Sequence, residues 1–181
     1  RLKKRFGMSM EGLVEQYTKL EARHIRKQDV RLAIDTIKKI LKAEYIKEQD
    51  VEKLYYDNEK WVKLMYASSG QQESLWILLV LFQRILQQQE TFLIVEEPEA
   101  HLFPVAQRYM MEMVGLFMYS TKSKAFITTH SPYVLNSLNV LAYAGKVEGK
   151  KADIESSVVP RGYRIFPGQL EAYILSRCEG T

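Results

Sequence analysis

Two adjacent carboxylates, Glu96 and Glu97, follow residues 91–95, a run of side chains suited to a buried strand. Pro98 ends that run, so both acids stand at the carboxyl edge of the expected strand. In parallel α/β sheets ligands bind beyond this edge. One carboxylate there can hold Mg²⁺, and the other can orient or deprotonate a water that attacks a phosphoryl group. The segment predicts metal-assisted chemistry on a phosphate, with Glu96 on the metal and Glu97 on the water. The alternative is that both acids cap the strand end and pair with lysines.

A histidine follows a second strand pattern. Residues 124–129 read as a buried strand, and His130 comes directly after them. If the two strands are neighbours, His130 lies on the same sheet edge as the acids, where an imidazole can donate to a γ-phosphate oxygen as charge develops. We therefore interpret His130 as a catalytic and nucleotide-binding residue. His101 is a weaker candidate, and His24 reads as an ordinary helix residue.

A small polar loop precedes an apolar helix expected over residues 73–87. Its residues are Ser68, Ser69, Gly70 and Gln71. Small residues allow a ligand to approach the backbone, and free N–H groups at a helix N-terminus attract anions. Ser68 and Gln71 are also spaced as a capping box, which is the alternative interpretation of the loop.

Alternating strands and helices must position these groups. The alternation predicts an α/β fold with parallel strands joined by crossover helices. Hydrophobic periodicity predicts helix over 13–43, with Asp29 as the N-cap of its second part, and two short strands within 51–66 that meet at a turn. Further elements are expected as strand 91–96, helix 103–119, strand 124–129, helix 132–138 and strand 140–144, then strand 163–166 and a helix or strand over 170–175.

Length and composition restrict the classes of protein. The 181 residues are 46% apolar and 27% charged, which is ordinary for one globular domain. The longest apolar run, Leu75 to Phe82, is too short to cross a bilayer, and no secretory signal is visible. A single cysteine excludes an internal disulfide and favours a reducing, cytoplasmic setting. The net charge of +4 permits contact with nucleic acid without arguing for it.

In their order, the three motifs resemble the C-terminal half of an ABC-type ATPase head, a parallel-sheet fold of the P-loop NTPase kind. The segments EEPEAHLFP and TTHSPYVL look most like the overcoming-lysogenization-defect family and related bacterial defence ATPases. The resemblance covers about residues 30–145. The helical pattern predicts a helical region over 1–50, and the resemblance implies that 51–181 is the lobe that carries the signature loop, the Walker B strand and the switch histidine.

The resemblance also implies roles for individual residues and the cofactors ATP and Mg²⁺. Glu96 takes the place of the usual Walker B aspartate, Glu97 that of the general base or water-positioning residue, and His130 that of the γ-phosphate contact. The loop at 68–71 would contact the nucleotide held by a second head, because in this family two heads sandwich ATP. Ser69 stands where glycine is more common.

One expected part is absent from the sequence. No G-x-x-x-x-G-K-[ST] pattern occurs in the 181 residues, so we expect the phosphate-binding loop to lie upstream of Arg1. This chain alone is then expected to bind ATP poorly and not to turn it over. The parent ATPase would form a homodimer, without a membrane, and gate a nuclease or other effector that acts on nucleic acid. The alternatives are a DNA-repair or chromosome-maintenance ATPase and a dimerisation module that does not hydrolyse ATP.

Overall fold

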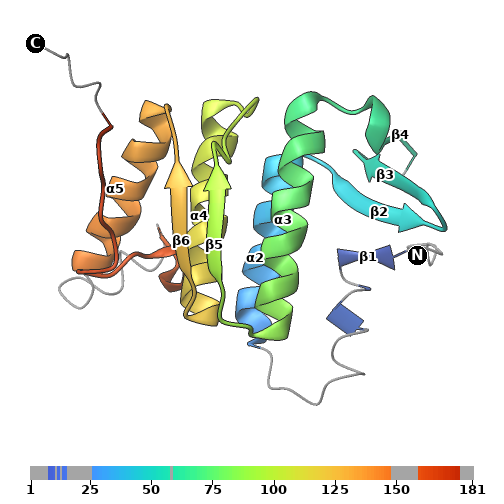
Figure 1. The fold of residues 1–181 in the computed structure, drawn as a ribbon. Coiled ribbons are helices and arrows are strands. Elements are labelled where there is room, and N and C mark those ends of the chain that lie inside the picture. The colour runs from blue at the N-terminus through green and yellow to red at the C-terminus, as the bar shows by residue number, and fades with distance from the viewer. Residues whose placement is uncertain are drawn as a thin grey trace, which may run out of the picture.

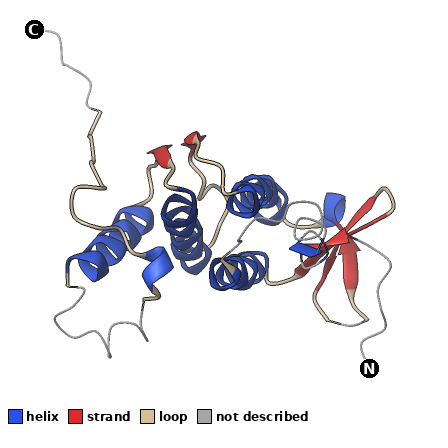
Figure 2. Cartoon of the chain, turned by 90° about the horizontal axis from the view of Figure 1, so that it is seen from below, coloured by secondary structure: helices blue, strands red, loops and turns tan. Residues whose placement is uncertain are grey.

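Long helices stand side by side and carry a pair of strands along one side (Figure 1, Figure 2). The computed structural model describes residues 8–10, 12, 14–15, 26–57, 59–147 and 159–175. Within these residues the long helices are α2 (Lys27–Leu41), α3 (Ser69–Gln87), α4 (Pro104–Thr121) and α5 (Pro132–Lys146). The fold is thus mixed α/β with a parallel sheet, as the alternation of elements predicts.

Local sequence sets where these helices begin and end. Proline occupies the first position of α4 and of α5, where its missing N–H is not needed. The α5 helix is also capped by Ser131, whose Oγ accepts from the backbone N–H of Tyr133 at 3.2 Å. Helices α2, α3 and α4 each end on a residue in the left-handed conformation: Lys42, Gln88 and Lys122.

The strands on the flank of the helices form a parallel pair. Strand β5 (Phe92–Glu96) lies beside β6 (Lys124–Thr128), with Phe92 opposite Lys124 and Glu96 opposite Thr128. Helix α4 is the crossover between them, which is the connection that parallel strands require. The expected neighbourhood of these strands is therefore confirmed.

A second, antiparallel sheet lies at the far end of the row of helices (Figure 2). Its strands follow the order β1 (Met8–Ser9), β2 (Glu44–Glu48), β3 (Val51–Tyr55) and β4 (Trp61–Lys63). The prediction of two short strands within 51–66 is confirmed. A short 3₁₀ turn, η1 (Leu64–Tyr66), then leads to α3.

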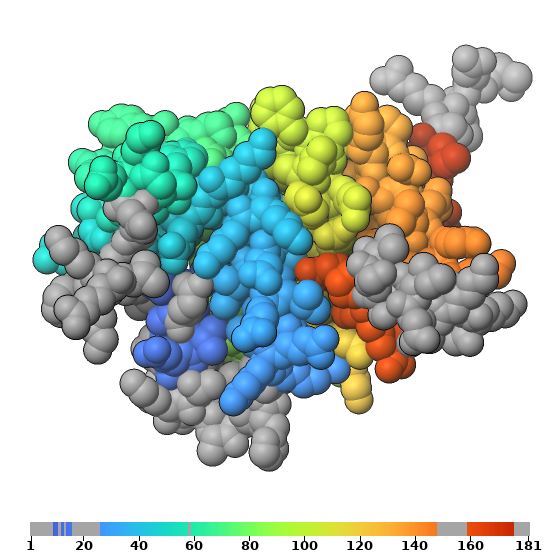
Figure 3. All heavy atoms as spheres, turned by 180° about the vertical axis from the view of Figure 1, so that it is seen from behind, coloured from blue at the N-terminus to red at the C-terminus, as the bar shows by residue number. Residues whose placement is uncertain are grey.

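The core lies between the helices, with α4 against α2, α3 and α5. Segment 159–166, which contains the 3₁₀ turn η2 (Arg161–Tyr163), packs beside α2 and α4 (Figure 3). The Tyr163 hydroxyl lies 2.7 Å from Thr36 Oγ1, and burial raises the pKa of this phenol. Gly115 of α4 admits this segment closely, since a Cβ there would lie 2.7 Å from the Tyr163 carbonyl oxygen.

Several predicted elements are wrong. Residues 140–144 continue α5 instead of forming a strand, because Val134, Ser137, Leu141 and Ala144 repeat at helical spacing and are all buried. Residues 163–166 and 170–175 form neither a strand nor an α-helix.

The N-terminal helical region also differs from expectation. Helix α2 ends at Leu41, and β2 occupies residues 44–48, so the helical region does not extend to residue 50. The predicted helix before residue 26 lies mostly outside the described residues. Asp29 is not the N-cap, because it lies in the first turn of α2, where it pairs with Arg26 at 3.0 Å.

Candidate functional site

The carboxyl ends of β5 and β6 bring Glu97 and His130 together. Glu97 Oε1 lies 3.2 Å from His130 Nε2. The backbone N–H of Glu97 also donates to the carbonyl of Thr128 at 3.0 Å, so the pairing of the strands continues one residue past β5. The His130 side chain is 91% exposed and that of Glu97 is 48% exposed. A carboxylate and an imidazole are therefore adjacent and open to a ligand.

A tight turn follows β5 and determines where Glu97 points. Glu97 and His101 both have left-handed backbone, with φ of 43° and 58°. The turn is closed by hydrogen bonds from Ala100 N to Glu97 O (2.9 Å) and from Leu102 N to Glu99 O (3.0 Å). Non-glycine residues with positive φ are uncommon and cluster at functional sites. This backbone removes Glu97 from the in-and-out alternation of β5 and lets its side chain reach β6.

Glu96 lies on the open face of the parallel pair. Alternate residues of β5 face the same side, and Phe92, Ile94 and Glu96 are its exposed positions. Within the described part of the chain the Glu96 carboxylate has no hydrogen-bond or ion-pair partner. Its carboxylate oxygens are thus available as ligands next to the Glu97–His130 pair.

Two residues that sequence reasoning gave no separate role, Glu99 and Gln107, form hydrogen bonds with the neighbours of His130. Glu99 is 6% exposed and accepts a hydrogen bond from the Thr129 hydroxyl. Gln107 of α4 accepts from Ser131 Oγ at 2.5 Å and donates to the Leu102 carbonyl at 2.9 Å. The repeated acid in Glu-Glu-Pro-Glu was the only signal for Glu99, and nothing local marks Gln107.

The loop before α3 forms the capping box that its spacing predicts. Ser68 Oγ accepts from Gln71 N at 3.3 Å, and Gln71 Oε1 accepts from Ser68 N at 3.2 Å. The Gln71 amide also donates to the carbonyl of Leu41 at 2.6 Å. Both side chains thus serve the fold, whereas the exposed Ser69 side chain has no hydrogen-bond partner among the described residues. The nucleotide-binding role of the loop stays a prediction.

The loop and the acidic turn touch each other. A Cβ added to Gly70 would lie 2.4 Å from the carbonyl oxygen of His101, so only glycine permits this approach. His101 Nε2 also lies 3.7 Å from Glu73 Oε2, one turn into α3. All three motifs therefore gather at the upper end of the molecule in Figure 1.

Comparison with known protein families places the chain in one of them. A model described as an AAA ATPase domain matches residues 9–135, which is well over half of the chain. The chain belongs to this family. No curated protein and no solved structure matches it.

Membership in the AAA ATPase family implies that the protein uses ATP as its nucleotide and usually Mg²⁺ as the accompanying ion. The described residues of this AAA ATPase domain hold no cluster of three or more His, Cys, Asp and Glu side chains. Proteins commonly bind Mg²⁺ through one or two carboxylates plus substrate phosphates. The free Glu96 carboxylate is such a donor. No phosphate-binding G-x-x-x-x-G-K-[ST] loop accompanies it in the 181 residues.

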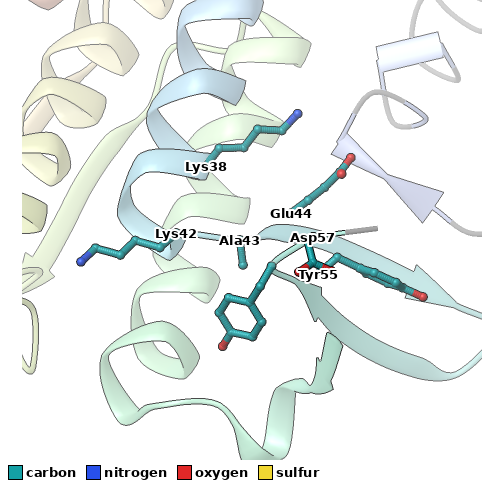
Figure 4. Close-up of a pocket in the computed structure, with 7 residues that line it drawn as sticks. Lys38, Lys42, Ala43, Glu44, Tyr55 and Asp57 are labelled. Atoms are coloured by element: carbon teal, nitrogen blue, oxygen red, sulfur yellow. The ribbon is translucent and has the colours of Figure 1, made fainter. Parts of the chain in front are cut away.

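A shallow depression of about 290 Å³ lies away from the strand ends, between the end of α2 and strands β2 and β3 (Figure 4). Lys38 and Lys42 border it, and their amino groups point to opposite sides. Backbone N–H groups of Glu59 and Lys60 lower the pKa of Asp57, which is at its rim. The charged groups do not converge, so the depression is not a second candidate for the nucleotide.

None of the helices described in this AAA ATPase domain is both long and apolar enough to cross a membrane.

Proposed function

We propose that this chain is the water-activating part of an ABC-type ATPase, similar to the overcoming-lysogenization-defect family. The observation that carries the proposal is the 3.2 Å contact between Glu97 and His130 at the ends of two parallel strands. An exposed carboxylate can orient or deprotonate water, and an imidazole beside it can donate to a phosphate oxygen as charge develops. Glu97 is then the base or water-positioning group, and His130 the phosphate contact.

The third role in the site belongs to Glu96. It ends the strand that the motif resemblance likens to Walker B, and its carboxylate has no hydrogen-bond or ion-pair partner among the described residues. Bound Mg²⁺ would neutralise charge on the phosphates. Glu96 would hold that ion, directly or through water, which leaves Glu97 for the water and separates the tasks of the two acids.

The open face of β5 and β6 supports a second, phosphate-binding lobe. Phe92, Ile94 and Phe126 are 63%, 65% and 53% exposed on that face, while Figure 2 shows the described helices only on the other. Parallel sheets are normally covered on both faces. An element that buried these three side chains would lie directly beside Glu96. We therefore propose that the phosphate-binding loop reaches the site from this side.

We further propose that two such heads close around ATP and that this cycle gates an effector. The loop at Ser69 and Gly70 lies at the same end of the molecule as the acids, where a second head's nucleotide could reach its backbone. The resemblance to defence ATPases favours a nuclease or other effector that acts on nucleic acid. A homodimer and ATP-dependent closure are the parts of this proposal that experiment can address first.

The test compares this chain alone with the ATPase in which it is joined to a phosphate-binding lobe. We expect the chain alone to bind ATP weakly and to release no phosphate, and the joined protein to hydrolyse ATP. Glu97→Gln should lower kcat by about 10² to 10⁴-fold and should trap an ATP-bound dimer in size-exclusion chromatography with light scattering. Glu90→Gln is the matched control, since Glu90 is an exposed acid at the opposite end of the strand.

Two outcomes would contradict the proposal. Robust, Glu97-dependent hydrolysis by the chain alone would show that the site is complete without another lobe. A Glu97→Gln protein whose dimerisation does not depend on ATP would argue against two heads that close on nucleotide.

A further inference from the structure

The residues on either side of His130 are tied to the acidic turn, although His130 itself is not buried. Thr129 donates its hydroxyl hydrogen to Oε1 of Glu99, and the same hydroxyl oxygen accepts from the backbone N–H of Ser131 at 3.0 Å. Thr129 thus connects the buried carboxylate of the turn with the backbone on the far side of His130.

A second bridge runs from Ser131 back to the same turn. Ser131 Oγ donates to Gln107 Oε1 at 2.5 Å, and Gln107 Nε2 donates to the carbonyl of Leu102 at 2.9 Å. Leu102 in turn donates its backbone N–H to Glu99 O. Both neighbours of His130 are therefore anchored to the turn that begins at Glu97.

The imidazole has little else to hold it. Its side chain is 91% exposed, and among the described residues its side-chain partner is Glu97. Exposed pairs of this kind contribute roughly 0–1 kcal/mol, too little to fix a ring against thermal motion. The placement of His130 beside Glu97 must therefore come from the backbone, and so from the anchors on Thr129 and Ser131.

The burial of Glu99 costs the folded state free energy, which a purely structural contact would not justify. Its carboxylate is buried, and Oε2 has no hydrogen-bond partner among the described residues. A buried polar atom without a partner destabilises the folded state, so such a group in a native fold calls for an explanation. A need to hold Thr129, whose hydroxyl donates to Oε1, would explain why this carboxylate is kept although Oε2 is unpartnered among the described residues.

We propose that Glu99 is a positioning residue: through Thr129 it sets the distance between His130 and Glu97. This inference rests on the proposed function for its biological meaning, because His130 and Glu97 are the groups assigned to phosphate and water. Its physical content is independent of nucleotide, since the hydrogen bonds are formed by this chain alone.

The test follows the His130 ring by ¹H–¹³C NMR, with its signal assigned against His24 and His101 by substitution. The readout is the change in ring chemical shift that Glu97→Gln causes, which reports how close the two groups are. We expect this change to fall at least twofold in the Thr129→Val background and to return in Thr129→Ser, which keeps the hydroxyl. Glu99→Leu should act like Thr129→Val, and Glu99→Gln, which keeps an acceptor oxygen, like Thr129→Ser.

Thermal unfolding by circular dichroism shows which variants fold, and Glu99→Leu replaces Thr129→Val if the latter does not. A folded Thr129→Val or Glu99→Leu protein that retains the full Glu97-dependent shift would overturn the proposal.

Kinetics of the joined ATPase then separate this proposal from the proposed function. We expect Thr129→Val to lower kcat by about 10- to 100-fold at unchanged KM, as for a displaced catalytic group. If the wild type does not hydrolyse ATP while the NMR results hold, the proposed function fails and the positioning role stands. If the wild type hydrolyses ATP and Thr129→Val keeps the wild-type kcat, the positioning role is wrong.

Discussion

The strand ends and the N-terminus of α3 meet at one end of this molecule, but they use their side chains differently. At the strand ends Glu97 and His130 project into solvent from a backbone that other groups hold. At α3 the side chains of Ser68 and Gln71 bond to each other, and Gln71 also bonds to the carbonyl of Leu41.

The difference separates two kinds of contribution to a nucleotide site. The side chains of Glu97 and His130 are available for chemistry, because neighbouring residues such as Glu99 and Thr129 form the hydrogen bonds that hold the backbone. At α3 the polar side chains complete the helix terminus, which leaves the exposed Ser69 and the backbone of the first turn to meet a ligand. Substitutions at the two places should therefore change different quantities.

After Glu97→Gln, the largest effect should come from His130. His130→Gln in the joined ATPase removes the group next to Glu97, and we expect kcat to fall by about 10²- to 10³-fold, the size reported for loss of one transition-state donor. His101→Gln is the control, because among the described residues the His101 side chain pairs only with the exposed Glu73, and it should change kcat less than about twofold. Equal losses from the two substitutions in steady-state assays would erase the distinction between the sites.

Gly70→Ala should affect stability more than any polar change in the loop. The added Cβ would lie 2.4 Å from the backbone oxygen of His101, so the helix must move away from the acidic turn. We expect a loss of about 1–3 kcal/mol in the free energy of unfolding, measured by urea denaturation. Ser69→Ala in the preceding position should be nearly neutral. A Gly70→Ala protein as stable as wild type would show that the two motifs are not tightly packed.

Ser68→Ala should have a smaller effect, because it removes one cap and no packing. Loss of a serine N-cap costs about 1 kcal/mol, so the urea midpoint should drop accordingly while Ser69→Ala leaves it unchanged. In the joined ATPase the order should reverse for ATP-dependent dimerisation, with Ser69 the more sensitive position. A stability loss at Ser69 instead of Ser68 would contradict the division between capping and ligand contact.

The smallest effect belongs to the pair of His101 and Glu73. Their atoms are 3.7 Å apart and both side chains are more than half exposed. A double-mutant cycle with His101→Gln and Glu73→Gln should give a coupling below about 1 kcal/mol that shrinks as salt is raised. A larger, salt-independent coupling would mean that this pair, like Glu97 and His130, is held in place by its surroundings.

Sequence patterns recovered the elements that carry the motifs and missed those at their margins. Strand 91–96 and helix 103–119 are close to β5 and α4, because the strand is a short apolar run that stops before Pro98 and the helix begins at Pro104. The run 140–144 failed, since a short apolar segment suits a strand as well as the buried side of a helix. Only packing on α4 shows that it completes α5.

The candidate site divides in the same way. The capping box of Ser68 and Gln71 could be predicted, because both partners lie within one helical turn. The contact of Glu97 with His130 was conditional on the pairing of two strands separated by a whole helix. Glu99 could not be chosen over its neighbours, since nothing local indicates that it is buried against Thr129.

By itself, the sequence determined the order of the motifs and the residues that end each strand, because periodicity, prolines and caps act over a few positions. Tertiary structure alone decided which ends of the strands meet, that Gly70 contacts the turn at His101, and that Glu99 is buried with one oxygen unpaired among the described residues. The physical reason is that burial and contact across the sheet depend on side chains tens of residues away. No local pattern encodes that distance, so the chemistry could be named from the sequence, while the groups that hold it in place could be found only in the fold.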